Sequence, residues 1–154
     1  MKKRLSVVFI MICILSMIGC GKKNVMALFS NQSGIDLTAG TIESEEDTHG
    51  GFLGDGCTLI VADYTDSLVP EMKANEHWHS LPLSGNLQTF VNQPFDDTVS
   101  IPQIKNGYYY FYDRHDESKD HYDDTDLLNR SSLNFTLAIY DSDTNQMYLL
   151  EYDT

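Results

Sequence analysis

The stretch Leu-Asn-Phe-Thr-Leu-Ala-Ile-Tyr at residues 133–140 decides the fold class. Its apolar residues recur at every second position, as they do on one face of a β-strand. These residues are Leu133, Phe135, Leu137 and Ile139. Residues 147–152 repeat the strand pattern, and the turn-forming run Asp-Ser-Asp-Thr-Asn at 141–145 separates the two segments. The sequence therefore predicts a β-hairpin here.

Further strand patterns lie upstream of this hairpin. An aromatic run at residues 108–112 follows the turn pair Asn-Gly, and aromatic residues favour strands. Residues 58–64 are apolar on both faces, as in an inner strand. Looser patterns predict strands at residues 35–43 and 87–91.

One helix is predicted between these strands. Asp66 or Ser67 would cap its first turn, Pro70 suits that turn, and the helix would run to about Trp78. Most of the strands are joined by loops, which favours antiparallel pairing. The expected fold is therefore α+β: a mostly antiparallel sheet of five to six strands with one packed helix. We expect it to form a single domain over residues 35–154.

The first twenty residues have the organisation of an export signal. Three cations at residues 2–4 precede a fourteen-residue run that contains only two serines among its apolar side chains. This run is short for a membrane span, which needs about 20 apolar residues. It fits the apolar region of a secretory signal peptide, which we expect to cover residues 1–19. An uncleaved membrane anchor is the alternative.

The residues before Cys20 resemble a known processing signal. Met17-Ile18-Gly19-Cys20 is similar to the lipobox of bacterial lipoproteins, with Met17 in place of the usual leucine. The resemblance implies that Cys20 carries a lipid and becomes the first residue of a membrane-anchored, extracytoplasmic protein. Residues 20–34 would then be the lipidated cysteine and a tether, in which the role of the apolar residues 25–29 stays open.

Charge and cysteine content restrict the partners of this chain. Seven Lys and Arg and all 23 Asp and Glu follow Cys20, which gives that part a formal net charge of −16. Such a charge argues against nucleic-acid binding and against direct adsorption to anionic lipid. Cys57 is the one thiol after Cys20, so no disulfide is expected, and its apolar neighbours favour a buried structural role.

Two short patterns suggest metal sites only weakly. Asp141, Asp143 and Asn145 have the opening spacing of a calcium loop, but Gln146 and Tyr152 stand where that loop needs Gly and Glu. A hairpin turn explains these residues fully. His77 and His79 flank a tryptophan, and a zinc site would need further ligands from elsewhere in the fold. We expect two surface histidines at a helix end.

Two loops carry the candidate functional residues. A glycine-rich loop at residues 45–56 contains His49 and Asp55, and a long charged loop at residues 113–126 contains Asp113 and His115. Loops of this length are uncommon and often functional. The run Asp47-Thr48-His49-Gly50-Gly51 together with residues 107–118 resembles uncharacterised lipoproteins of Gram-positive bacteria, a resemblance that implies a cell surface but no activity.

The charged loop is also a weak candidate for binding a divalent cation. Asp123, Asp124 and Asp126 crowd negative charge into four positions. A calcium ion would relieve their repulsion, because it takes six to eight oxygen ligands. The alternative is that water and salt screen an exposed loop, and no other cofactor is expected.

Two functions of different classes remain open from the sequence. The first is a non-enzymatic binding or interaction module with a protein or small-molecule partner, which agrees with the absence of known catalytic motifs. The second is a small metal-assisted hydrolase that uses the two loops. The hydrolase requires both loops to lie at one end of the sheet, with His49 and His115 in a shared pocket.

Overall fold

The structure, a computed structural model, describes residues 25–50, 54–92 and 100–154. The chain divides into two compact units, residues 1–39 and 40–154. In the first unit, residues 25–33 are helical, so the apolar residues 25–29, whose role the sequence left open, lie in a helix. The Ser30 hydroxyl donates to the Met26 carbonyl at 2.7 Å and accepts from the Leu37 amide at 2.8 Å. This serine ties the helix to the segment that follows it.

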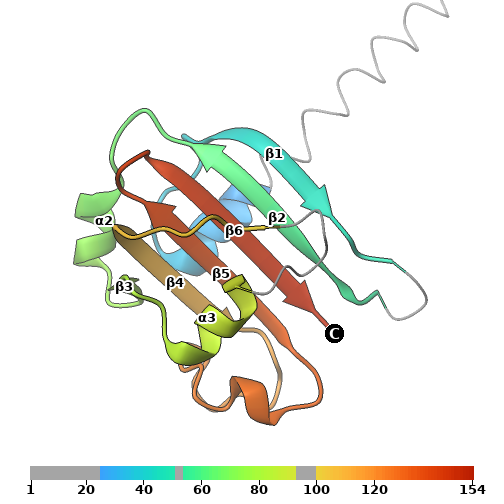
Figure 1. Cartoon of the computed structure of the whole chain (residues 1–154). Coiled ribbons are helices and arrows are strands. Elements are labelled where there is room, and N and C mark those ends of the chain that lie inside the picture. Colours follow the sequence, from blue (N-terminus) through green and yellow to red (C-terminus); the bar gives the residue numbers. More distant parts are fainter. Residues whose placement is uncertain (1–24, 51–53, 93–99) are drawn as a thin grey trace, which may run out of the picture. The chain divides into compact units, whose positions relative to one another are not determined.

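The second unit is built on one six-stranded sheet (Figure 1). Its strands are β1 (Thr41–Asp47), β2 (Gly56–Asp63), β3 (Trp78–Ser80), β4 (Gly107–Asp113), β5 (Asn134–Asp141) and β6 (Gln146–Asp153). They lie in the order β1-β2-β6-β5-β4-β3, and each neighbouring pair is antiparallel. The predicted antiparallel sheet is confirmed, as are the C-terminal hairpin and the inner position of β2.

The helices differ from the one that the sequence predicted. Helix α2 (Val69–Ala74) ends earlier than expected, and Trp78 instead begins β3. Residues predicted as a strand at 87–91 belong to a second helix, α3 (Gly85–Asn92). The Ser84 hydroxyl accepts the Leu87 amide at 3.2 Å and so caps this helix. Residues 87–91 contain only three apolar side chains, Leu87, Phe90 and Val91, which are too few for their spacing to separate helix from strand.

The first strand is also displaced from its expected place. A strand was predicted over residues 35–43, but β1 begins at Thr41 and carries four acidic residues. Six of its seven residues are exposed. The strand lies at the edge of the sheet, where it pairs with β2 alone. An exposed edge strand needs no apolar face, so hydrophobic alternation could not locate it. Its negative charge discourages pairing with other strand edges.

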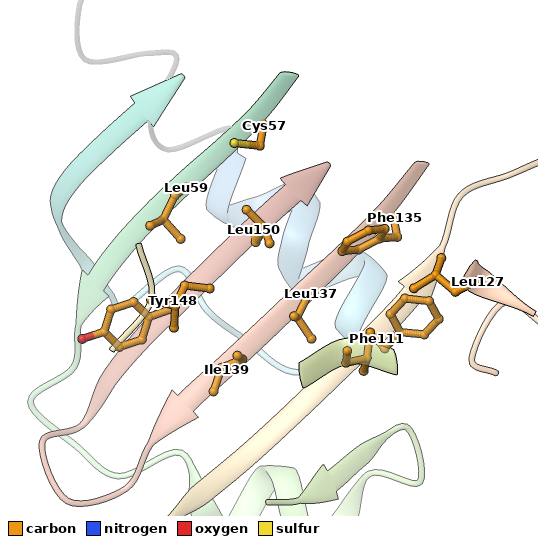
Figure 2. Close-up of a cluster of buried hydrophobic side chains, with 11 residues drawn as sticks. Cys57, Leu59, Phe111, Leu127, Phe135, Leu137, Ile139, Tyr148 and Leu150 are labelled. Atoms are coloured by element: carbon orange, nitrogen blue, oxygen red, sulfur yellow. The ribbon is translucent and has the colours of Figure 1, made fainter. Parts of the chain in front are cut away.

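One face of the sheet carries a continuous apolar core (Figure 2). It receives side chains from β2, β4, β5 and β6, together with Leu87 of α3 and Leu127 of the short 3₁₀ helix η1 (Leu127–Asn129). Phe135, Leu137 and Ile139 all lie in it, as their alternation predicted. Cys57 belongs to the same cluster, and its side chain is buried, as expected.

The opposite face of the inner strands is buried as well. Thr136, Ala138 and Tyr140 alternate with the core residues of β5, and each is at most 1% exposed. The two-residue period predicted one apolar face on this strand, with Thr136 on the other face, but Thr136 is fully buried too. Its hydroxyl is buried and has no hydrogen-bond partner among the described residues.

Candidate functional site

Both candidate loops leave the sheet at the same end. In the strand register, Gly56 and Asn134 each lie opposite Asp153, and Asp113 lies opposite Phe135. The start of β2, the end of β4 and the start of β5 therefore meet near the end of β6. We call this region, with the connections that leave it, the loop end of the sheet. Because both loops leave the sheet here, the first requirement of the hydrolase hypothesis is met.

A chain of ionic contacts crosses the loop end. Nδ1 of His49 lies 2.6 Å from Oδ1 of Asp47, and Nε2 lies 3.2 Å from Oδ2 of Asp153. The other oxygen of Asp153 lies 3.0 Å from Nη2 of Arg114. The series of contacts from Asp47 through His49 and Asp153 to Arg114 thus links the β1–β2 connection, the end of β6 and the first residue after β4. We call these four residues the bridging network.

Backbone packing fixes the position of His49 in this network. A Cβ atom on Gly56 would lie 2.5 Å from the His49 Cα and 2.6 Å from its amide nitrogen. Only glycine leaves room for so close an approach of the two backbone segments. The Thr48 amide also donates to the Cys57 carbonyl at 2.9 Å. His49 is therefore held against the start of β2, from where its ring reaches Asp153.

The two carboxylates favour the charged form of His49. The hydrogen bond to the Asp47 side chain raises the pKa of His49 above 6.5; partial burial lowers it, and Asp153 raises it further. In turn, the His49 amide and ring lower the pKa of Asp47. The arrangement stabilises an imidazolium between two carboxylates, which is the wrong protonation state for a metal ligand.

Asp113 has a different role from its neighbour Arg114. Its side chain is 2% exposed, and Oδ2 lies 2.7 Å from Nη2 of Arg130. Burial raises the pKa of Asp113, but hydrogen bonds from Arg130, the His115 amide and Ser118 outweigh it, so the pKa lies below its usual value. Asp113 therefore pairs with Arg130 and not with Arg114, its neighbour in sequence.

The four candidate loop residues do not form one pocket. Asp55 lines a groove beside β6, and Asp113 lies at a separate cleft of the long loop, with a volume of about 390 Å³. His115 accepts the Glu117 amide at Nδ1, 3.2 Å away, within its own turn. His49 and His115 share none of the described pockets. The second requirement of the hydrolase hypothesis is thus unmet in the described part of the chain.

The long loop is fastened to the fold rather than merely solvated. Two hydrogen bonds join His121 to Asp113. The Asp113 amide donates to the His121 carbonyl at 2.7 Å, and Nδ1 of His121 donates to the Asp113 carbonyl at 2.6 Å. Tyr122 stacks on His77, with ring centroids 3.6 Å apart. These contacts return the loop to β4 and to the segment before β3, so His77 is packed against the loop while His79 remains exposed.

The proposed cation ligands have separate local partners. Asp123 accepts the Thr125 amide at 2.9 Å, and Asp126 accepts the Asn129 side chain at 3.4 Å. Asp124 accepts the Ser84 hydroxyl, which joins the loop to the start of α3. In the part of the chain that the structure describes, no group of three or more His, Cys, Asp or Glu residues is placed to hold a metal ion.

We expect calcium to have no specific effect on thermal stability. A bound ion would raise the melting temperature with its concentration by mass action. Because Asp123, Asp124 and Asp126 have separate partners, we expect millimolar calcium to shift the melt no more than magnesium or matched sodium chloride. A calcium-specific rise that disappears when the three residues are replaced by Asn would contradict this expectation.

The hairpin at residues 141–145 is a turn, as the sequence predicted. Asp141 accepts the Asp143 amide at 2.8 Å, and Asn145 has a left-handed backbone with φ of 57°. The Asn145 side chain accepts the Tyr140 hydroxyl at 2.7 Å. All three residues of the calcium-like spacing therefore have structural roles in the turn.

Sequence reasoning singled out His49 but missed the other three members of the bridging network, Asp47, Arg114 and Asp153, and the partner of Asp113. Asp47 and Asp153 lie at strand ends, and Arg130 lies seventeen residues after Asp113. Asp47 had a local signal, because a carboxylate two residues before a histidine can accept its amide. Asp153 and Arg130 had none, since only strand register and loop folding bring them to the site.

Comparisons with known proteins add no family to these observations. No protein-family model, curated protein or solved structure matches this chain. Within the described residues, none of the helices has both the length and the apolar character needed to cross a bilayer.

Proposed function

We propose that this chain is a lipid-anchored, extracytoplasmic binding module. In this proposal, the lipoprotein signal at residues 1–19 is removed, and a lipid on Cys20 holds the protein at the cell membrane, on a Gram-positive cell surface. The support for anchoring is the lipobox-like Met17–Cys20 run behind three cations and an apolar segment. The high negative charge of the rest of the chain favours a domain that does not itself adsorb to anionic lipid.

The pairing of charges at the loop end carries the binding part of the proposal. His49, Arg114 and Arg130 each contact a carboxylate. A general base or a metal ligand needs an available lone pair, whereas both ring nitrogens of His49 already face carboxylate oxygens. The paired charges suit a rigid polar surface that recognises a protein or small-molecule partner. The described residues meet the first requirement of the hydrolase alternative but not the second, because His49 and His115 share none of the described pockets.

Replacement of Cys20 by alanine should abolish lipid attachment. The thiol is the proposed site of acylation, so Cys20→Ala should accumulate as an uncleaved precursor without label from a radiolabelled fatty acid. Cys57→Ala and Cys13→Ala are the matched controls, because they remove the other two thiols and should keep the label. Equal incorporation into Cys20→Ala and the unchanged chain would sink the anchoring proposal.

A further inference from the structure

The bridging network holds its histidine in a geometry that depends on one proton. Both ring nitrogens of His49 face carboxylate oxygens, at 2.6 Å and 3.2 Å. Only the imidazolium carries a hydrogen on both nitrogens and can donate to both. A neutral ring keeps one hydrogen, so its other nitrogen must present a lone pair to a negatively charged oxygen. One of the two contacts is therefore lost when His49 is deprotonated.

Of the two contacts of the His49 ring, the one with Asp153 is the weaker. Asp47 is two residues from His49 and already accepts its backbone amide at 3.0 Å, so this contact is local as well as shorter. Asp153 lies on β6, beyond β2 in the sheet, and its other oxygen is held by Arg114. The remaining hydrogen should stay on Nδ1, facing Asp47, while the lone pair on Nε2 repels Asp153.

We propose that His49 is a proton-operated latch that fastens the β1–β2 connection to the end of β6. With the proton present, the latch spans β2 and joins β1 to β6 through Asp153. Without it, the His49–Asp153 contact opens, while the Arg114–Asp153 contact persists. The chain thereby contains a pH-sensitive device at the end of the sheet that carries both long loops. This inference is independent of lipid anchoring and of any bound partner.

The surroundings of His49 set the pH at which the latch opens. The described groups in contact with its ring are Asp47 of β1, Asp153 of β6 and the Thr58 hydroxyl of β2, which lies 3.3 Å from Nδ1. Arg114 is the nearest cation of the network and acts through Asp153. The two carboxylates outweigh partial burial and raise the pKa of His49. Its stabilising effect is therefore complete below about pH 6.5 and is lost as the pH rises through the raised pKa.

Two nuclear magnetic resonance measurements on the full chain in detergent test the latch. The ring ¹⁵N shifts of the histidines report which nitrogen loses its hydrogen, and we expect Nε2 of His49 to do so. Protection of the Gly50 amide, which donates to the Asp55 carbonyl at 3.3 Å, reports the fastening of the connection. We expect its protection factor to fall as the pH passes the pKa of His49.

Opposite substitutions separate the latch from a general effect of pH. His49→Arg keeps a positive charge at every pH used, so protection should stay high. His49→Gln cannot form the imidazolium contact, so protection should be low and independent of pH. Asp153→Asn should lower the pKa of His49 and remove the pH step. His79→Gln, on the exposed part of β3, is the matched control and should leave the step unchanged.

Three results would overturn the latch. The first is loss of the hydrogen from Nδ1 rather than from Nε2. The second is a pH step in Gly50 protection that survives in His49→Gln. The third is constant Gly50 protection in the unchanged chain while His49 itself titrates.

Discussion

Replacement of Leu137 by alanine is expected to lower the free energy of unfolding by about 2–5 kcal/mol. Leu137 is fully buried on β5, between Phe111 of β4 and Leu150 of β6 in the strand register. Truncation removes apolar atoms from the centre of the core and leaves a cavity that the regular sheet cannot close easily (Figure 2). Chemical denaturation of the chain without residues 1–20 measures this cost.

Thr136 provides the comparison, because it is the neighbour of Leu137 and is equally buried. Its hydroxyl has no described hydrogen-bond partner, and an unsatisfied buried polar group costs about 1–3 kcal/mol. Valine has nearly the same shape without that group. We therefore expect Thr136→Val to be neutral or stabilising under the same conditions. A loss of stability in Thr136→Val as large as that in Leu137→Ala would mean that the Thr136 hydroxyl makes a stabilising hydrogen bond.

Replacement of Arg130 by methionine should cost about 3–5 kcal/mol, the usual effect of leaving a buried charge without its partner. Asp113 is 2% exposed and Arg130 is 16% exposed, so water cannot readily replace the guanidinium. The Nε atom of Arg130 is also buried without a described partner, so methionine removes one unsatisfied donor. The free energy of unfolding at neutral pH measures the balance of these effects.

The double variant Asp113→Asn, Arg130→Met tests the cause of this loss. It removes both charges, so it should be more stable than Arg130→Met alone. Acid gives a second test. The pKa of Asp113 is lowered in the fold, so the ion pair stabilises above about pH 4 and this stabilisation is lost as the pH falls through the lowered pKa. The difference in the free energy of unfolding between Arg130→Met and the unchanged chain should therefore become smaller in acid. A difference that does not change with pH would mean that lost packing, rather than the lost charge, causes the destabilisation.

The sheet could be predicted where apolar side chains recur with a clear period. The apolar residues of β5 follow a two-residue period, β6 contains the apolar run at 147–150, and β4 is a run of aromatic residues, which favour strands. In contrast, β1 is an exposed acidic strand, and α3 has only three apolar residues, which are too few to show its period. Burial of both faces of β5 also escaped prediction, because threonine and alanine are common on solvent-facing strand positions.

The candidate site could be predicted as a pair of loops but not as a set of contacts. His49 and Asp113 were identified from their unusual surroundings, and both have central roles at the loop end. Their partners Asp153 and Arg130 come from distant positions, and register brings Asp153 beside the start of β5. A sequence pattern reports local spacing, whereas these ion pairs depend on the order of strands in the sheet.

The central position of β6 has a consequence for synthesis of the chain. It follows the other five strands in sequence, yet it lies between β2 and β5 (Figure 1). Until it emerges from the ribosome, the nascent chain can form only a β1–β2 hairpin and a separate β3–β4–β5 sheet, each with an unpaired edge. Such edges and their apolar faces are prone to aggregation. A premature stop codon before Gln146 would thus yield two unjoined fragments of sheet rather than a slightly smaller domain.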